Sequence, residues 1–209
     1  MSVEEILKLL ERDRSFYERS GGGVTVSGGE VMVQWEFVSM LLEQCRKAGI
    51  HTCVESALHC STEHMLPVLE NADMLITDIK FFDSARHKAV VGQGNELILK
   101  NIARACSLGL PVVIRTPLIP GWNDDEENLR AIAAFIKELG SAVICWQLLP
   151  YRKMGTEKYA SLNMPYPMGD YEAPERSVWE PALLEKRDMI AREFGLPVVA
   201  GAAEKLPGY

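Results

Sequence analysis

The chain has 209 residues, of which 47% are hydrophobic and 24% charged, and its formal net charge is −7. This acidic balance argues against a nucleic-acid surface, and no run approaches the roughly 20 apolar residues that a membrane span requires. Acidic residues from Glu4 to Asp13 also interrupt the start of the chain, where a signal peptide would need an apolar core. We therefore expect one globular domain over residues 1–209, located in the cytoplasm, that binds neither nucleic acid nor membrane.

The first predicted element is an amphipathic helix over residues 2–19. It opens with Ser2 three residues before Glu5, the spacing of a capping box. The glycine-rich stretch SGGGVTVSGGE, from Ser20 to Glu30, then ends this helix. Within that stretch, VTVS is the first run with the character of a strand.

From there apolar runs alternate with amphipathic helices. Strands are predicted at HTCVES, DMLITDIK, PVVIRTPLI and SAVICWQLLPY, and helices at 34–48, 63–71, 96–108 and 124–139. Five such runs joined by helices predict a parallel sheet buried on both faces, in a barrel or an open doubly wound sheet.

The last part of the chain, 161–209, is less regular. It predicts a loop at 164–177, a last helix at 178–194, and a short apolar strand with a frayed end in LPVVAGAAEKLPGY. We treat it as an irregular tail of the same domain.

Polar or charged residues follow or end every predicted strand. In chain order they are Gly28, Gly29 and Glu30; Glu55 and Ser56; Asp78 and Lys80; Arg115; and Tyr151 and Arg152. Because the carboxyl ends of the strands of a β/α barrel meet at one end, these groups would line one pocket. Its acids and bases would suit a zwitterionic ligand with an amine and a carboxylate. Any single acid could instead cap the next helix or pair with a neighbouring base.

The SGGE turn is the most distinctive of these strand ends. Glycine at 28 and 29 would let the backbone approach a ligand, and Glu30 would accept a charge-assisted hydrogen bond from its ammonium. A plain tight connection between strand and helix is the alternative. The turn is not a phosphate loop, because the Lys-Ser/Thr ending of GxxxxGK[ST] is missing.

Neither the cysteines nor the histidines form a recognisable ligand set. The five cysteines follow no CxxC or CxxxCxxC pattern, and the four histidines no HExxH pattern. We expect reduced thiols in the core of a protein from a reducing compartment, and no metal ligands in this chain.

Four segments resemble, in order and spacing, the activating enzymes of glycyl radical enzymes, a family of the radical S-adenosylmethionine (SAM) superfamily whose best-known member activates pyruvate formate-lyase. They are GGGVTVSGGE, DIK at 78–80, IRTPLIPGWND at 114–124 and QLLPY at 147–151. The resemblance covers roughly residues 1–160 and implies an incomplete parallel β/α barrel, the radical SAM core without its first strand. We adopt this as the α/β fold class.

The same resemblance implies which residues hold S-adenosylmethionine. Gly28, Gly29 and Glu30 would hold its amino group, and Arg115 would lie in the barrel interior. Further positions would help to hold the methionyl carboxylate, through a cation in some members: Glu55, Ser56, Asp78, Ile79 and Lys80. Arg152 stands where many relatives have a histidine after LLPY, so a ribose or carboxylate contact is expected of it only by position.

The family also holds a four-iron four-sulfur cluster on a CxxxCxxC segment before the glycine turn. With the reduced cluster it cleaves S-adenosylmethionine, and the radical formed takes a hydrogen from a glycine of a partner enzyme. No cysteine precedes the glycine run here. We therefore expect the cofactor-binding part of an activase that lacks cluster ligands and is inactive by itself. The implied partners are a pyruvate formate-lyase-like glycyl radical enzyme and a reducing flavodoxin or ferredoxin.

Two other functions stay open. The chain could be a cluster-less module that binds the cofactor or a partner without catalysis, or a barrel lyase that uses Lys80 as a Schiff-base amine. A sheet without its first strand would expose an edge, so we expect self-association unless the helix at 2–19 covers it. The segment 164–174 reads as a surface loop or as a contribution to partner docking.

Overall fold

The computed structural model describes residues 1–169 and 171–201. Its centre is a six-stranded parallel sheet in which the strands follow one another in sequence order. The strands are β1 (Gly23–Val26), β2 (His51–Glu55), β3 (Met74–Asp78), β4 (Val112–Leu118), β5 (Val143–Pro150) and β6 (Val198–Ala200). Within the described residues β1 and β6 do not pair, so the sheet stays open. The predicted fold class, an incomplete parallel barrel, is confirmed, and the tail supplies the sixth strand.

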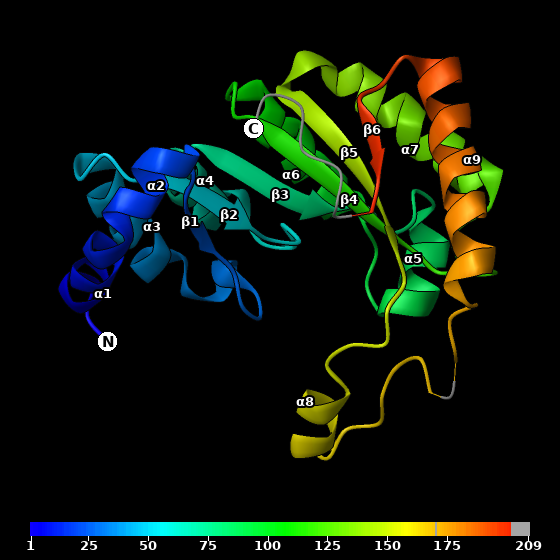
Figure 1. The fold of residues 1–209 in the computed structure, drawn as a ribbon, viewed down its shortest axis with the longest axis horizontal. Coiled ribbons are helices and arrows are strands. Elements are labelled where there is room, and N and C mark those ends of the chain that lie inside the picture. Colours follow the sequence, from blue (N-terminus) through cyan, green and yellow to red (C-terminus); the bar gives the residue numbers. More distant parts are fainter. Residues whose placement is uncertain (170, 202–209) are drawn as a thin grey trace.

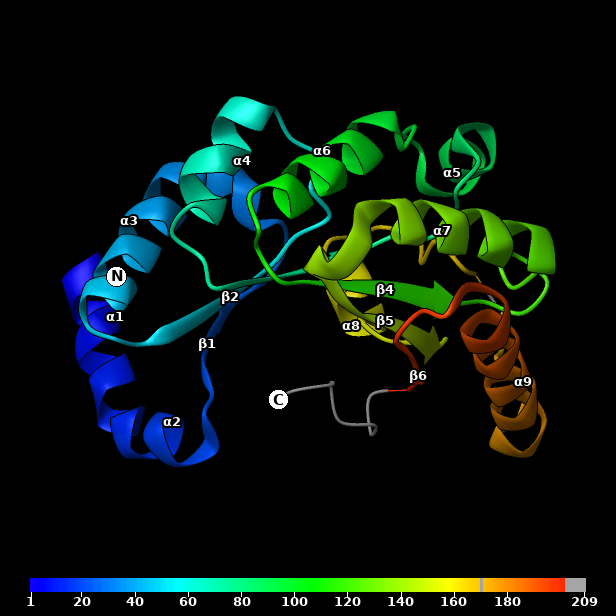
Figure 2. The same ribbon diagram turned by 90° about the horizontal axis from the view of Figure 1, so that it is seen from above.

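Helices cover one face of the sheet, which arches beneath them (Figures 1 and 2). They are α3 (Trp35–Lys47), α4 (Thr62–Leu69), α6 (Glu96–Ser107) and α7 (Glu126–Leu139). Their amphipathic patterns place apolar side chains against the sheet, where Leu42, Ile102 and Ile132 meet Leu75 and Trp146 in the main core, all fully buried. At the two ends of the arch lie α1 (Val3–Leu10) with α2 (Arg14–Ser20), and α9 (Arg176–Phe194).

The opposite, concave face of the sheet has a smaller apolar cluster of its own. It is formed by Cys53, Met74, Ile76, Val113, Cys145 and Val199. Side chains alternate between the two faces of a strand. A residue two positions after a member of this cluster therefore lies on the same concave face, nearer the carboxyl end of its strand.

Several predicted boundaries need correction. The helix predicted at 2–19 is divided by one turn of 3-10 helix, Glu11–Asp13, into α1 and α2. Two short helices were not predicted: α5 (Ser84–Val91) and α8 (Thr156–Ser161). The frayed end predicted after β6 falls at 202–209, outside the described residues. None of the helices in the described ranges combines the length and the apolar character needed to cross a bilayer.

Candidate functional site

Three polar side chains stand next to one another across the middle of the concave face. Asp78 of β3 pairs in register with Arg115 of β4, and Arg115 pairs with Gln147 of β5. Each follows a member of the concave apolar cluster by two residues, which is why all three share that face. Arg115 lies within its strand, because β4 continues to Leu118.

Arg115 links strands that are not neighbours. Its Nη1 donates to Glu55 Oε1 on β2 at 3.0 Å, across β3, and its Nε donates to Gln147 Oε1 at 2.9 Å. Ser27 Oγ lies 3.3 Å from Glu55 Oε2 and extends the network to the end of β1. Gln147 and Ser27 are not among the site residues predicted from the sequence. For Gln147 the available signal was its spacing of two from Cys145 in a strand whose concave side chains are otherwise apolar.

Glu30 is held firmly at the turn after β1. Its carboxylate accepts hydrogen bonds from the backbone N–H of Met32 at 3.0 Å, from Ser56 Oγ at 2.6 Å and from the backbone N–H of Ala57 at 3.0 Å. The turn before it needs glycine at one position, since Gly28 has φ of 142°. The structure thus joins Glu30 to Ser56 as one unit, and leaves open space where side chains at 28 and 29 would project.

The DIK segment presents an ion pair at the end of β3. Lys80 Nζ lies 2.8 Å from Asp78 Oδ2, and both side chains are about one third exposed. The Ile79 side chain is buried in the main core instead, so only its backbone belongs to this edge. Its carbonyl accepts from Thr116 Oγ1 at 2.7 Å, and Thr116 in turn accepts from Trp146 Nε1 at 2.9 Å. This buried chain of hydrogen bonds fixes the backbone of the DIK segment from the main-core side of the sheet.

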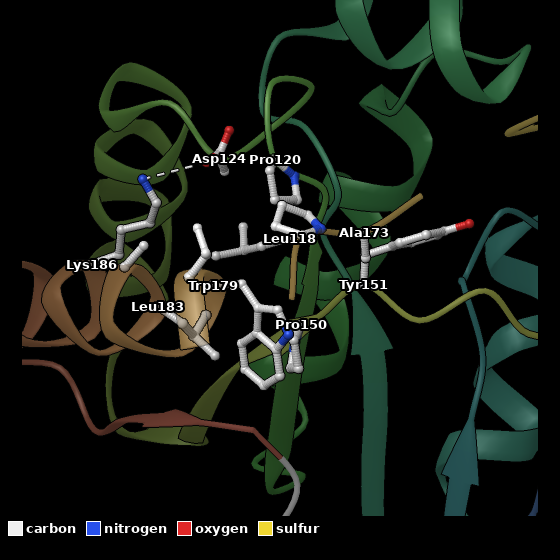
Figure 3. Close-up of a pocket in the computed structure, with 12 residues that line it drawn as sticks. Leu118, Pro120, Asp124, Pro150, Tyr151, Ala173, Trp179, Leu183 and Lys186 are labelled. Atoms are coloured by element: carbon white, nitrogen blue, oxygen red, sulfur yellow. Dashed lines mark ion pairs between the residues drawn. The ribbon is translucent and has the colours of Figure 1, made fainter. Parts of the chain in front are cut away.

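A groove between α9 and the ends of β4 to β6 holds the last predicted residue. Exposed Arg152 lines it together with Trp179 and Leu149, and its cavity volume is about 770 Å³. A smaller, largely apolar cavity of about 110 Å³ adjoins it (Figure 3). There Trp179 faces Pro150, and the Lys186–Asp124 ion pair, 3.6 Å long, lies at the other end. This groove is not predicted by the sequence pattern.

The loop after β5 packs against this region. Ala173 and Pro174 line the smaller cavity, and the Tyr171 hydroxyl donates to the Pro120 carbonyl at 3.2 Å. Tyr166 and Tyr151 share a hydrogen bond between their hydroxyls at 3.1 Å. The predicted segment 164–174, apart from residue 170, is therefore a surface loop anchored to the end of β4 and β5, and its role in partner docking stays a prediction.

The thiols of the described chain are not arranged to bind a metal. None of the five cysteines forms a disulfide, and Cys60 alone among them is partly exposed. Burial raises the pKa of Cys53, Cys60 and Cys106 to about 11, which disfavours the thiolate that binds metals. Among residues 1–169 and 171–201, no group of three or more His, Cys, Asp or Glu side chains could hold a metal ion.

The chain resembles known proteins along most of its length. Residues 1–132 match the family model of the radical SAM superfamily. The chain is 40% identical to a (2S)-3-sulfopropanediol dehydratase activating enzyme of Klebsiella oxytoca, over 98% of this chain and 64% of that protein. It is 36% identical to a pyruvate formate-lyase-activating enzyme of Clostridium pasteurianum, over 84% of this chain and 73% of that protein. It thus spans less than two thirds of the Klebsiella protein.

A solved structure supports the same relationship. The crystal structure of a domain of pyruvate-formate lyase-activating enzyme from Bacteroides vulgatus ATCC 8482 superposes with a TM-score of 0.67 and 32% sequence identity. The match covers 87% of this chain and 99% of that domain. Fold, family model and relatives agree, and the chain belongs to the radical SAM superfamily and, within it, to the family of glycyl radical enzyme activating enzymes.

Proposed function

We propose that this chain binds S-adenosylmethionine at the carboxyl ends of β1 to β5 and is the cofactor-binding part of a glycyl radical enzyme activating enzyme. The observation that carries the proposal is the convergence of opposite charges on one edge of the sheet. Glu30, Glu55 and Asp78 stand there with Lys80 and Arg115. A methionyl group has both an ammonium and a carboxylate, so it needs acceptors and donors side by side.

Each end of the ligand has candidate partners among these groups. Glu30 already accepts three hydrogen bonds, two on Oε1 and one on Oε2, so a free position on Oε2 is available for the ligand ammonium. Lys80 and Arg115 keep N–H groups beyond those bonded to Asp78, Glu55 and Gln147, and these would receive the carboxylate. Gly28 and Gly29 leave the approach to Glu30 clear of side chains.

The iron–sulfur cluster of the superfamily has no such candidate partners among the described residues. A four-iron four-sulfur cluster supplies the electron for the cleavage of S-adenosylmethionine in this superfamily, and cysteine thiolates bind it. The described residues provide no such ligand set. We therefore assign this chain the binding and orientation of the cofactor, and no reductive step. Hydrogen abstraction from a glycine of a partner enzyme, and reduction by flavodoxin or ferredoxin, remain proposals for the whole activase.

A ligand titration tests the binding. We expect isothermal titration of the 209-residue chain to show S-adenosylmethionine binding, and Arg115→Met to weaken it about 10- to 100-fold, the value of one charge-assisted contact. Arg104→Met is the matched control, because the one side-chain partner of exposed Arg104 among the described residues is Ser107 of its own helix. Absence of binding by the unmodified chain, or equal effects of the two variants, would contradict the proposal.

A cluster-less binding module is the second candidate, favoured by the same lack of a ligand set in the described chain. Reconstitution with iron and sulfide tests what the two candidates share, a chain that binds no cluster by itself. We expect this chain alone to give no cluster absorption and no 5'-deoxyadenosine under reducing conditions. If both appear, the assignment of a purely binding role is wrong.

For the lyase alternative, borohydride trapping with a carbonyl substrate must label Lys80, whose amine is engaged by Asp78 in the structure.

A further inference from the structure

Gln147 is the one polar side chain on the described concave part of β5, and the proposed function assigns it no role. It is 6% exposed and stands in register beside Arg115. Burial of an amide is unfavourable unless it is hydrogen-bonded. Its Oε1 accepts from Arg115 Nε at 2.9 Å, and this bond determines which way the amide points, because Nε can only donate.

The two bonds made by Arg115 fix its guanidinium plane. Gln147 holds Nε, and Glu55 holds Nη1 from the opposite side of β3. A planar fork held at two nitrogens cannot rotate about its last bond without losing one of them. Three of its five N–H groups, including both on Nη2, have no partner among the described residues. The direction in which these three N–H groups point is therefore fixed before a ligand binds.

The charge of the holding groups matters as much as their positions. Glu55 offsets the single positive charge of Arg115, and Gln147 adds none. A second carboxylate in place of the amide would leave the trio with a net negative charge and repel an anionic ligand group. A neutral acceptor at 147 thus orients the guanidinium and leaves it able to attract a carboxylate.

From this geometry we propose that Gln147 is a positioning residue that directs Arg115 at the carboxylate of the bound S-adenosylmethionine. The inference rests on the proposed function, since it takes that molecule as the ligand. It assigns carboxylate recognition to the Gln147–Arg115–Glu55 trio, with Gln147 acting only through Arg115.

The test compares two ligands that differ by one group. S-adenosylmethionine and its decarboxylated form share the sulfonium, the amine and the adenosine, so their affinity ratio reports the carboxylate contact alone. Gln147→Met keeps the length of the side chain and removes the acceptor. Gln147→Glu keeps the acceptor and adds a charge. Both ligands are titrated into the unmodified chain and each variant, with far-UV circular dichroism to verify folding.

We expect Gln147→Met to weaken S-adenosylmethionine about tenfold and to change the decarboxylated ligand less than twofold. Gln147→Glu should also weaken S-adenosylmethionine but tighten the decarboxylated cation, an opposite response that a merely structural role does not produce. Equal losses for both ligands, or no loss, would overturn the inference while the proposed function stands. If the unmodified chain binds neither ligand, the proposed function fails and the inference with it.

Discussion

Two buried threonines on adjacent strands should respond in opposite ways to the same substitution. Thr116 is fully buried, and its hydroxyl bonds both the Ile79 carbonyl and the Trp146 indole N–H. Thr77 is equally buried, 1% exposed, yet its hydroxyl has no hydrogen-bond partner within the described part of the chain. Valine keeps the β-branched shape at either position and replaces only the hydroxyl with a methyl group.

For Thr116→Val the cost follows from the two groups left behind. Ile79 and Trp146 are both buried, so the freed carbonyl and N–H find no water. Each orphaned group costs about 1–3 kcal/mol, and we expect the free energy of unfolding to fall by about 3 kcal/mol. For a domain of this size that corresponds to a melting temperature lower by about 6–12 °C.

For Thr77→Val the sign reverses. Removal of a buried hydroxyl without a partner should raise the free energy of unfolding by about 1 kcal/mol. Urea unfolding followed by far-UV circular dichroism measures both variants on one scale. If both shift in the same direction by similar amounts, the hydrogen-bond chain behind the DIK segment does not exist as described.

Three further predictions concern two glycines and the thiols. Gly23→Ala should cost at least about 1–3 kcal/mol, because a Cβ there overlaps the backbone carbonyl of His51 in β2; an unchanged thermal melt would contradict the β1–β2 register. Gly28→Ala meets no atom but keeps φ of 142°, so strain of about 1–3 kcal/mol and weaker S-adenosylmethionine binding are expected; unaltered stability by urea titration would refute the strain. Because burial raises the pKa of Cys60 and Cys106 to about 11 from an ordinary value of 9.0, unfolding releases thiol protons in this range, so the free energy of unfolding should fall as pH rises from 9 to 11. Cys106→Ala should flatten that decline, and an identical slope would argue against it.

The strand-end residues could be predicted because two local rules place them. Alternation within a strand puts Glu55 and Asp78 on one face, and parallel strands bring their ends to one edge. Pattern alone could not show which groups pair. That Arg115 reaches past β3 to Glu55, rather than to its neighbour Asp78, depends on side-chain length and on the twist of the sheet.

Other features depend on packing between distant segments. The groove beside Trp179 exists only because α9 docks against the ends of β4 and β5, which precede it by about 30 residues or more. The helix α5 could not be predicted from its pattern because SARHKAVV has no clear apolar stripe, and its local signs are limited to the capping residues Asp83 and Gly92. Gln147 could not be predicted as a site residue from pattern alone, because it lies inside an otherwise apolar strand.

The sheet grows in the order in which the chain is made. Each of the six described strands pairs only with the strands just before and after it in the sequence, so none of these six has to wait for a partner translated much later. Glu30 and Ser56 can meet as soon as the second strand has left the ribosome, and Arg115 reaches Glu55 two strands later. Gln147 is the last of these groups to emerge. On a nascent chain, the orientation of Arg115 would thus be completed only after its charge partner is already in place.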